Sequence, residues 1–114
     1  MKRFLLSVLL ASCAVSAHAE TVSVAVAANF TEPAEEIAEA FAQATDHTAQ
    51  LSFGASGQFY TQITQAAPFE VFLSADVERP AKAVEEGFGV HGSVFTYAIG
   101  QLALYATDAS LVTG

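Results

Sequence analysis

The stretch TVSVAVAANFTEPAEEIAEAFAQATDHTAQLSFGASGQ, residues 21–58, decides the fold of this chain. Residues 21–28 are rich in valine and alternate along the chain, a pattern that predicts a β-strand. Residues 32–44 place apolar side chains at helical spacing, with glutamates on the other faces, which predicts an amphipathic helix. Residues 48–53 then alternate as a second strand. A strand, a helix and a further strand in this order indicate a parallel sheet.

The same alternation of strand and helix continues further along the chain. Residues 59–66 are predicted to be helical, and residues 71–73 form a short, wholly apolar run typical of a buried parallel strand. Residues 80–86 are predicted to form a helix that Gly87 ends. Residues 95–107, FTYAIGQLALYAT, are a long β-rich stretch that we expect to leave the first sheet. The predicted fold class is therefore α/β, built from successive βα units.

The first nineteen residues have the features of a secretory signal peptide. Two basic residues precede the apolar run 4–10, and the small-x-small ending at residues 17–19 provides a cleavage site. The mature chain is therefore predicted to begin at Glu20. The apolar run is well under the roughly 20 residues that a membrane-spanning helix needs, which argues against a transmembrane anchor.

A second way of processing the signal segment is left open. Residues 10–13, LASC, resemble the lipobox of bacterial lipoproteins, in which Cys13 would be lipidated and the protein anchored. We favour simple cleavage and release into the periplasm, because residues 17–19 offer a good site just ahead of the first strand. Cys13 is the only cysteine in either case, so the mature domain is predicted to contain no disulfide.

Removal of residues 1–19 leaves a strongly acidic chain. All twelve Asp and Glu residues lie beyond that segment, whereas only Arg79 and Lys82 remain basic, so the net charge becomes −10. Nucleic-acid binding depends on Lys and Arg side chains that neutralise phosphates. We therefore expect no nucleic-acid partner.

Small polar residues stand at two junctions where a predicted strand gives way to a helix. These are residues 28–31, ANFT, and residues 54–57, GASG. Ligands of parallel α/β sheets bind beyond the carboxyl ends of the strands, where helix amino termini present free N–H groups. Each terminus acts like about half a positive charge, so two of them predict an oxyanion site without any arginine. Asn29 and Ser56 have an alternative interpretation as ordinary helix caps.

The mature sequence resembles the molybdate-binding proteins of bacterial molybdate ABC transporters. The resemblance covers almost every mature residue and rests on residues 24–41, VAVAANFTEPAEEIAEAF, and residues 51–76, LSFGASGQFYTQITQAAPFEVFLSAD. It implies the two-lobed periplasmic binding protein fold of type II. Residues 20–94 would then be the amino-terminal part of the first lobe, and residues 95–114 the crossover toward a second lobe. We expect the chain to be an amino-terminal fragment of such a protein.

The resemblance also implies the ligands. Asn29 and Ser56 fall on the two oxyanion donors, and the main-chain N–H groups of Ala28 and Gly57 would be second-tier donors. Serine is commoner than asparagine at the position of Asn29, although an amide donates equally well. Glu70 replaces the usual aspartate. Molybdenum would be held only through its oxygens, with no metal ligand from the protein and no cofactor.

The function that the resemblance implies is capture rather than catalysis. The full-length protein would be a monomeric, non-enzymatic receptor that takes up molybdate and tungstate in the periplasm. It would deliver the oxyanion to the membrane permease of an ABC transporter. A receptor for another tetrahedral oxyanion, such as sulfate or phosphate, is the nearer alternative, because such anions share helix-terminus sites.

A secreted serine hydrolase is the remote alternative. Ser56 lies on a strand-turn-helix, but Gln58 stands where the motif G-x-S-x-G needs its second glycine. Only His47 and His91 would remain as a general base after cleavage, and neither is supported as one. Neither histidine has a His or Cys neighbour at metal-ligand spacing, so we predict no metal site.

Four further polar residues are given structural interpretations. Asp76 begins the third connection and is interpreted as a helix cap rather than a ligand. Tyr60, Tyr97 and Tyr105 are interpreted as packing residues.

Overall fold

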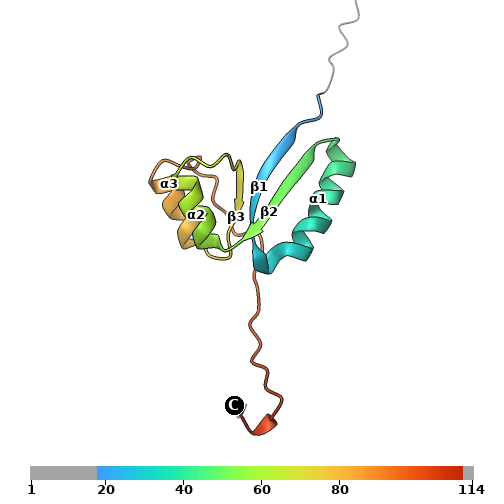
Figure 1. Ribbon diagram of the computed structural model, residues 1–114, viewed down its shortest axis with the longest axis vertical. Helices are drawn as coiled ribbons and strands as arrows, with labels where there is room; N and C mark the ends of the chain where they lie inside the picture. Colours follow the sequence, from blue (N-terminus) through green and yellow to red (C-terminus); the bar gives the residue numbers. More distant parts are fainter. Residues whose placement is uncertain (1–17, 112–114) are drawn as a thin grey trace, which may run out of the picture.

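The computed structural model of the chain describes residues 18–111 (Figure 1). The predicted signal peptide, except for residues 18 and 19, lies outside the described residues, as does the alternative lipidation point Cys13. Within residues 18–111, no helix combines the length and the apolar character that crossing a membrane would require.

Strands and α-helices alternate through the first part of the described chain. They are β1 (Thr21–Ala27), α1 (Thr31–Thr45), β2 (Thr48–Gly54), α2 (Ser56–Thr64), β3 (Val71–Leu73) and α3 (Glu78–Glu85). Two short 3-10 helices are added, η1 (Ala28–Phe30) directly after β1 and η2 (Ala109–Leu111) near the end. The predicted succession of βα units is thus confirmed. The helices α2 and α3 begin a few residues earlier than predicted, which leaves Pro80 in the first turn of α3, where proline is tolerated.

The three strands form one parallel sheet in the order β2-β1-β3. β1 and β2 pair over their full length, from Thr21 opposite Thr48 to Ala27 opposite Gly54. β3 pairs with the other edge of β1, where Leu73 lies opposite Val26. The three strands therefore end at the same edge of the sheet, and the segments that follow them begin side by side.

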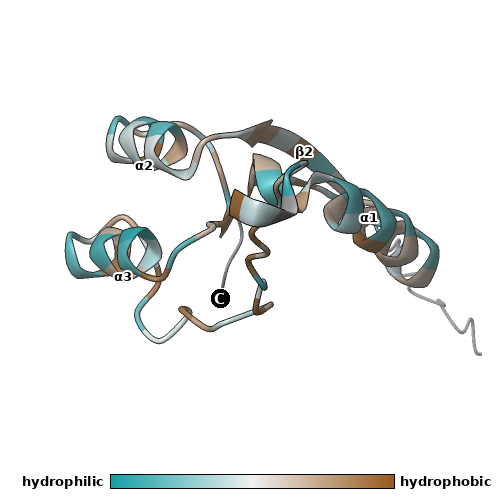
Figure 2. Cartoon of the chain, turned by 90° about the horizontal axis from the view of Figure 1, so that it is seen from below, coloured by the Kyte–Doolittle hydropathy of each residue, from teal (hydrophilic) through white to brown (hydrophobic). Residues whose placement is uncertain are grey.

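The central strand β1 forms the core. Its residues 24–27 expose at most 6% of their surface, because both faces of the strand are covered. On one face, Val24 and Val26 pack against Ala34 of α1. On the other side of the sheet lie α2 and α3, from which Phe59 and Ala83 are buried (Figure 1). The view in Figure 2 shows α1 well separated from the pair α2 and α3.

Residues 95–107 differ from the sequence-based expectation. They contain no strand, although their composition is β-rich, and they run away from the body of the fold as an extended segment (Figure 1). Ile99 and Leu102 expose 89% and 105% of their surface. A strand is stabilised by pairing and by packing of one face. Tyr97 packs against Phe30, but none of residues 95–107 pairs with a strand within the described residues. The expectation that the segment leaves the first sheet is confirmed.

Candidate functional site

The two predicted ligand residues follow neighbouring strands at equal distances. β1 and β2 remain paired up to Ala27 and Gly54, and Asn29 and Ser56 each come two residues later. Asn29 lies in η1, and Ser56 opens α2. Because parallel strands that pair in register end together, both residues are placed at the same edge of the sheet.

Ser56 is the better fixed of the two. Its side chain is buried, with 8% exposed, and its Oγ accepts a hydrogen bond of 3.0 Å from the backbone N–H of Ala75. The residue preceding α2 is Ala55, and no side chain caps this helix. The interpretation of Ser56 as an ordinary cap is therefore wrong. A hydroxyl that already accepts one hydrogen bond still has its own proton to donate.

Asn29 is exposed and lines a cavity of about 860 Å³. Ser74, Ala75 and Asp76, from the loop after β3, line the same cavity, together with residues 94–102. Neither η1 nor α1 is capped by a side chain, so the cap interpretation is wrong for Asn29 as well. Ser56 does not line this cavity directly, but its partner Ala75 does. The structure therefore places Asn29 in the wall of the cavity and Ser56 in hydrogen-bond contact with Ala75, a residue of that wall.

The second-tier residues stand beside these two. Ala28 is exposed in η1, and its carbonyl oxygen accepts a hydrogen bond of 2.9 Å from the Thr31 hydroxyl. Gly57 lies in the first turn of α2, where backbone N–H groups have no partner within the helix. Their roles as main-chain donors stay predictions.

Arg79 lies at this site, although the sequence predicted an oxyanion site without any arginine. Its Nε and Nη2 atoms lie 3.5 Å from the point where a Cβ on Gly57 would stand, so the guanidinium covers the first turn of α2. The guanidinium also forms an ion pair with Asp76. The positive charge is thus held next to the helix terminus but is balanced by a carboxylate. The sequence signal was the spacing of Asp76 and Arg79, three residues apart at a helix start.

Asp76 precedes Val77, the N-cap residue of α3, and its carboxylate bonds the first turn of this helix. Its Oδ1 accepts a hydrogen bond of 2.8 Å from the backbone N–H of Arg79, in the first turn of α3. Burial alone would raise the pKa of the Asp76 carboxyl, but the hydrogen bonds and the charge of Arg79 outweigh burial and hold this pKa below its usual value. Asp76 is therefore ionised at neutral pH.

Three residues that the sequence analysis did not assign to the site lie around Ser56. These are Ser74, Ala75 and Tyr97, of which Ser74 is buried. The Tyr97 hydroxyl donates a hydrogen bond of 2.8 Å to the carbonyl oxygen of Ser74. The Tyr97 ring also packs edge-on against Phe30, with ring centroids 5.0 Å apart, which confirms its packing role and adds a polar one. Residues 74–76 form a third strand-helix junction, and this was the signal available in the sequence.

His47 is too far along β2 to act on Ser56. It precedes β2, whereas Ser56 follows it, and a strand of seven residues spans about 20 Å. His47 Nδ1 instead accepts a hydrogen bond of 3.1 Å from the backbone N–H of Glu20. His91 is exposed in the loop that follows α3. His47 is thus not placed as a general base for this serine.

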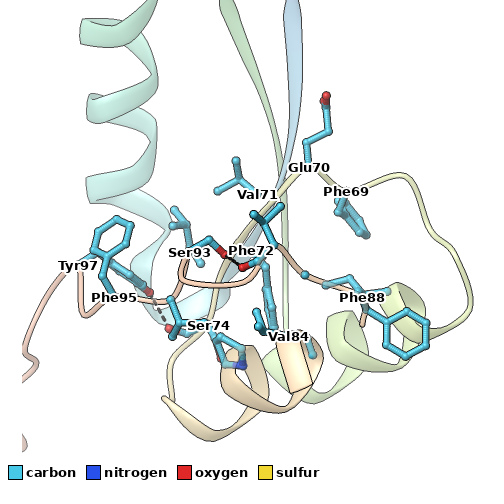
Figure 3. Close-up of a pocket in the computed structure, with 17 residues that line it drawn as sticks. Phe69, Glu70, Val71, Phe72, Ser74, Val84, Phe88, Ser93, Phe95 and Tyr97 are labelled. Carbon is cyan, nitrogen blue, oxygen red and sulfur yellow. Dashed lines mark hydrogen bonds between the residues drawn. The ribbon is translucent and has the colours of Figure 1, made fainter. Parts of the chain in front are cut away.

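A second cavity, of about 530 Å³, lies along β3 and is mainly apolar (Figure 3). Its wall is formed by Phe72 of β3, by Val84 of α3 and by the loop that contains Phe88 and Phe95. Tyr97 lines both cavities. None of the predicted ligand residues lines this apolar cavity.

Comparisons with known proteins agree with this architecture. The chain is 63% identical over 99 residues to the molybdate-binding protein ModA of Rhodobacter capsulatus, and 50% identical over 99 residues to ModA of Azotobacter vinelandii. Each alignment covers 87% of this chain and 39% of the relative. Among solved structures, this chain is similar to the periplasmic molybdate-binding protein of Azotobacter vinelandii, with a TM-score of 0.68 and 46% sequence identity. That similarity covers 69% of this chain and 34% of the other.

The resemblance drawn from residues 24–41 and 51–76 is confirmed by these relatives, and so is the predicted fold class. The chain spans about two fifths of the curated relatives that it matches, since 39% of each is covered. Residues 22–111 match the model of a family described as bacterial extracellular solute-binding protein. The chain belongs to this family of bacterial extracellular solute-binding proteins.

Proposed function

We propose that this chain is the amino-terminal part of a periplasmic receptor that captures molybdate and tungstate and delivers them to the permease of an ABC transporter. The observation that supports this most is the buried Ser56 hydroxyl at the start of α2, at the sheet edge that also bears Asn29. The relatives named as molybdate-binding proteins align with 87% of this chain, which also supports the proposal.

Neutral donors can hold a dianion at this edge despite the acidic surface. The described residues contain only two Lys or Arg side chains, Arg79 and Lys82, and Arg79 is paired with Asp76. Donors within a cleft act at hydrogen-bond distance in a lower dielectric, whereas exposed carboxylates are screened by salt over about 8 to 10 Å. The Asn29 amide, the Ser56 hydroxyl and the free N–H groups of the α2 terminus would supply these donors.

Selection of the anion is proposed to depend on size. Molybdate and tungstate are larger than sulfate, and donors spaced for the larger tetrahedron would bind the smaller one through stretched hydrogen bonds. The remaining donors would come from a second lobe and from the chain's return to the first lobe. Export through residues 1–19, a monomeric full-length state and the absence of catalysis complete the proposal.

Titration calorimetry tests this function. The sample is the complete protein, meaning the receptor of which this chain is proposed to be the amino-terminal part, without residues 1–19. We expect molybdate and tungstate to bind tightly, and sulfate and phosphate to give no saturable heat at the same concentrations. Binding of sulfate or phosphate instead would assign a different oxyanion. If none of the four anions binds, the receptor function is wrong.

A further inference from the structure

One peptide group links Tyr97 to Ser56. The carbonyl oxygen of Ser74 accepts the hydrogen bond from the Tyr97 hydroxyl, at 2.8 Å, and the N–H of Ala75 donates to Ser56 Oγ, at 3.0 Å. These two atoms belong to the same peptide bond, the one that joins Ser74 to Ala75. Figure 3 shows the Tyr97 hydroxyl directed at Ser74 across the loop that follows β3. The peptide plane is thus held from both ends.

The hydrogen bonds of this chain of groups all run in one direction. Tyr97 donates to the peptide carbonyl, the peptide N–H donates to Ser56, and the Ser56 proton is left to be donated onward. Hydrogen bonds in series polarise one another, so each donor is strengthened by the one before it. An anion that accepts the last hydrogen bond of such a series is therefore bound more strongly than by an isolated hydroxyl.

We propose that Tyr97 is a positioning residue of the oxyanion site, which acts through the Ser74–Ala75 peptide group to orient Ser56 toward the bound anion. The proposal rests on the proposed function, because it gives Ser56 the role of an anion ligand. Tyr97 itself does not touch the anion. Burial raises the pKa of its phenol, so the hydroxyl keeps its proton well above neutral pH.

The ring of Tyr97 connects this series to the first junction. It packs edge-on against Phe30, which directly follows Asn29 in η1. Little else fixes the peptide group within the described residues: the nearest further hydrogen bond of this loop runs from the Asp76 N–H to the Ser74 hydroxyl, at 3.3 Å. Tyr97 therefore contacts both the first junction, through Phe30, and the third, through Ser74.

The test is a double-mutant cycle between Tyr97→Phe and Ser56→Ala, measured by molybdate calorimetry on the complete protein. Tyr97→Phe keeps the ring against Phe30 and removes only the hydroxyl. We expect it to weaken molybdate binding about 3- to 10-fold, the value of one net hydrogen bond, and to have less than about a 2-fold effect when Ser56 is already alanine. Tyr105→Phe is the matched control. The packing role predicted for Tyr105 is wrong, because this residue is 83% exposed, so the variant should bind molybdate as tightly as the wild type.

Two results would overturn the proposal while the receptor function stands. In the first, Tyr97→Phe binds molybdate as tightly as the wild type. In the second, it weakens binding by the same factor with and without Ser56, which would make its effect one of general packing. A thermal melt of each variant shows that the compared proteins are folded.

A second measurement separates the proposal from the receptor function. The amide proton of Ala75 is followed by NMR without any anion, and Tyr97→Phe should shift it upfield and speed its exchange, whereas Tyr105→Phe should not. If no anion binds the wild type, the receptor function fails together with the positioning role. In that case, a shifted and faster-exchanging Ala75 amide proton in Tyr97→Phe would support the hydrogen-bonded series alone, without a role in anion binding. An unchanged Ala75 amide overturns the series whatever the anion result.

Discussion

The two strand-helix junctions at the candidate site differ in how firmly they are built, although β1 and β2 end in register. After β1, Asn29 is exposed in a single turn of 3-10 helix, and its side chain makes no cap. After β2, Ser56 is buried, and the N–H of Ala75 from the third junction holds its Oγ. The same position relative to a strand thus gives one loosely held side chain and one fixed side chain.

The difference shows what orders a donor at a helix terminus. The helix start places the side chain, but a contact from another element restricts its rotation. A fixed donor loses less conformational entropy when it binds a ligand, so it contributes more of its hydrogen-bond energy to affinity. We therefore expect the second junction to dominate anion binding, and the following variants of the complete protein test that ranking.

Removal of the fixed donor should have the largest effect. Ser56→Ala deletes the hydroxyl and leaves the Ala75 N–H without its acceptor, so molybdate binding should weaken by about 1 to 3 kcal/mol. Calorimetry measures the loss. Ser110→Ala, an exposed serine of η2, is the control and should bind normally. An unchanged affinity in Ser56→Ala would remove Ser56 from the ligand set.

Loss of the Asp76 carboxylate should loosen the third junction. Asp76→Ala removes the hydrogen bond to the Arg79 N–H and should lower the free energy of unfolding by about 0.5 to 2 kcal/mol, as for other lost caps. Chemical denaturation measures it. Glu78→Ala, an acid in the same turn, is the comparison. If both variants lose the same stability, the Asp76 hydrogen bond is not the cause.

The Asp76 contribution should depend on pH with a definite sign. Its pKa is lowered on folding from the usual 3.8, so the stabilisation is fully present above that value. It should decline as the pH falls below 3.8 through the folded-state pKa. The difference in unfolding free energy between wild type and Asp76→Asn should therefore shrink in acid. A difference that stays constant down to pH 2 would contradict the low pKa.

Changes at the loosely held donor should have the smallest effect. Asn29→Ala should weaken molybdate binding by about 0.5 to 1.5 kcal/mol, less than Ser56→Ala does. Asn29→Ser keeps a donor, and should restore most of the affinity. If Asn29→Ala weakens molybdate binding more than Ser56→Ala does, the ranking of the two junctions is reversed. The exposure of a side chain would then not predict how much it contributes to anion binding.

The sequence was sufficient for much of the fold. Valine alternation in β1, the apolar run of β3 and the helical spacing of α1 are local patterns, and each predicted its element within a few residues. Residues 95–107 show the limit of local patterns. Their side chains suit a strand, yet strand formation depends on a neighbour to pair with, and the described chain provides none beside them.

The candidate site was predicted only in part for the same reason. Asn29 and Ser56 stand at helix starts, which local sequence can indicate. The surroundings of Ser56 could not be read in this way, because Ala75 lies 19 residues further along and Tyr97 another 22. The contact of Arg79, in α3, with Gly57, in α2, joins two helices and was not predicted either.

Local patterns were enough to predict the order and type of the elements, the acidic charge and the positions of the two polar junctions, since periodicity and composition act over a few neighbouring residues. The strand order β2-β1-β3, which brings the junctions after all three strands to one edge, could be seen only in the folded chain. The tertiary structure also shows that Ser56 is not a cap but a buried hydroxyl that accepts a hydrogen bond from the Ser74–Ala75 peptide group. The physical reason is that these hydrogen bonds join groups far apart in the chain, and only sheet pairing and burial of β1 set the distances between them.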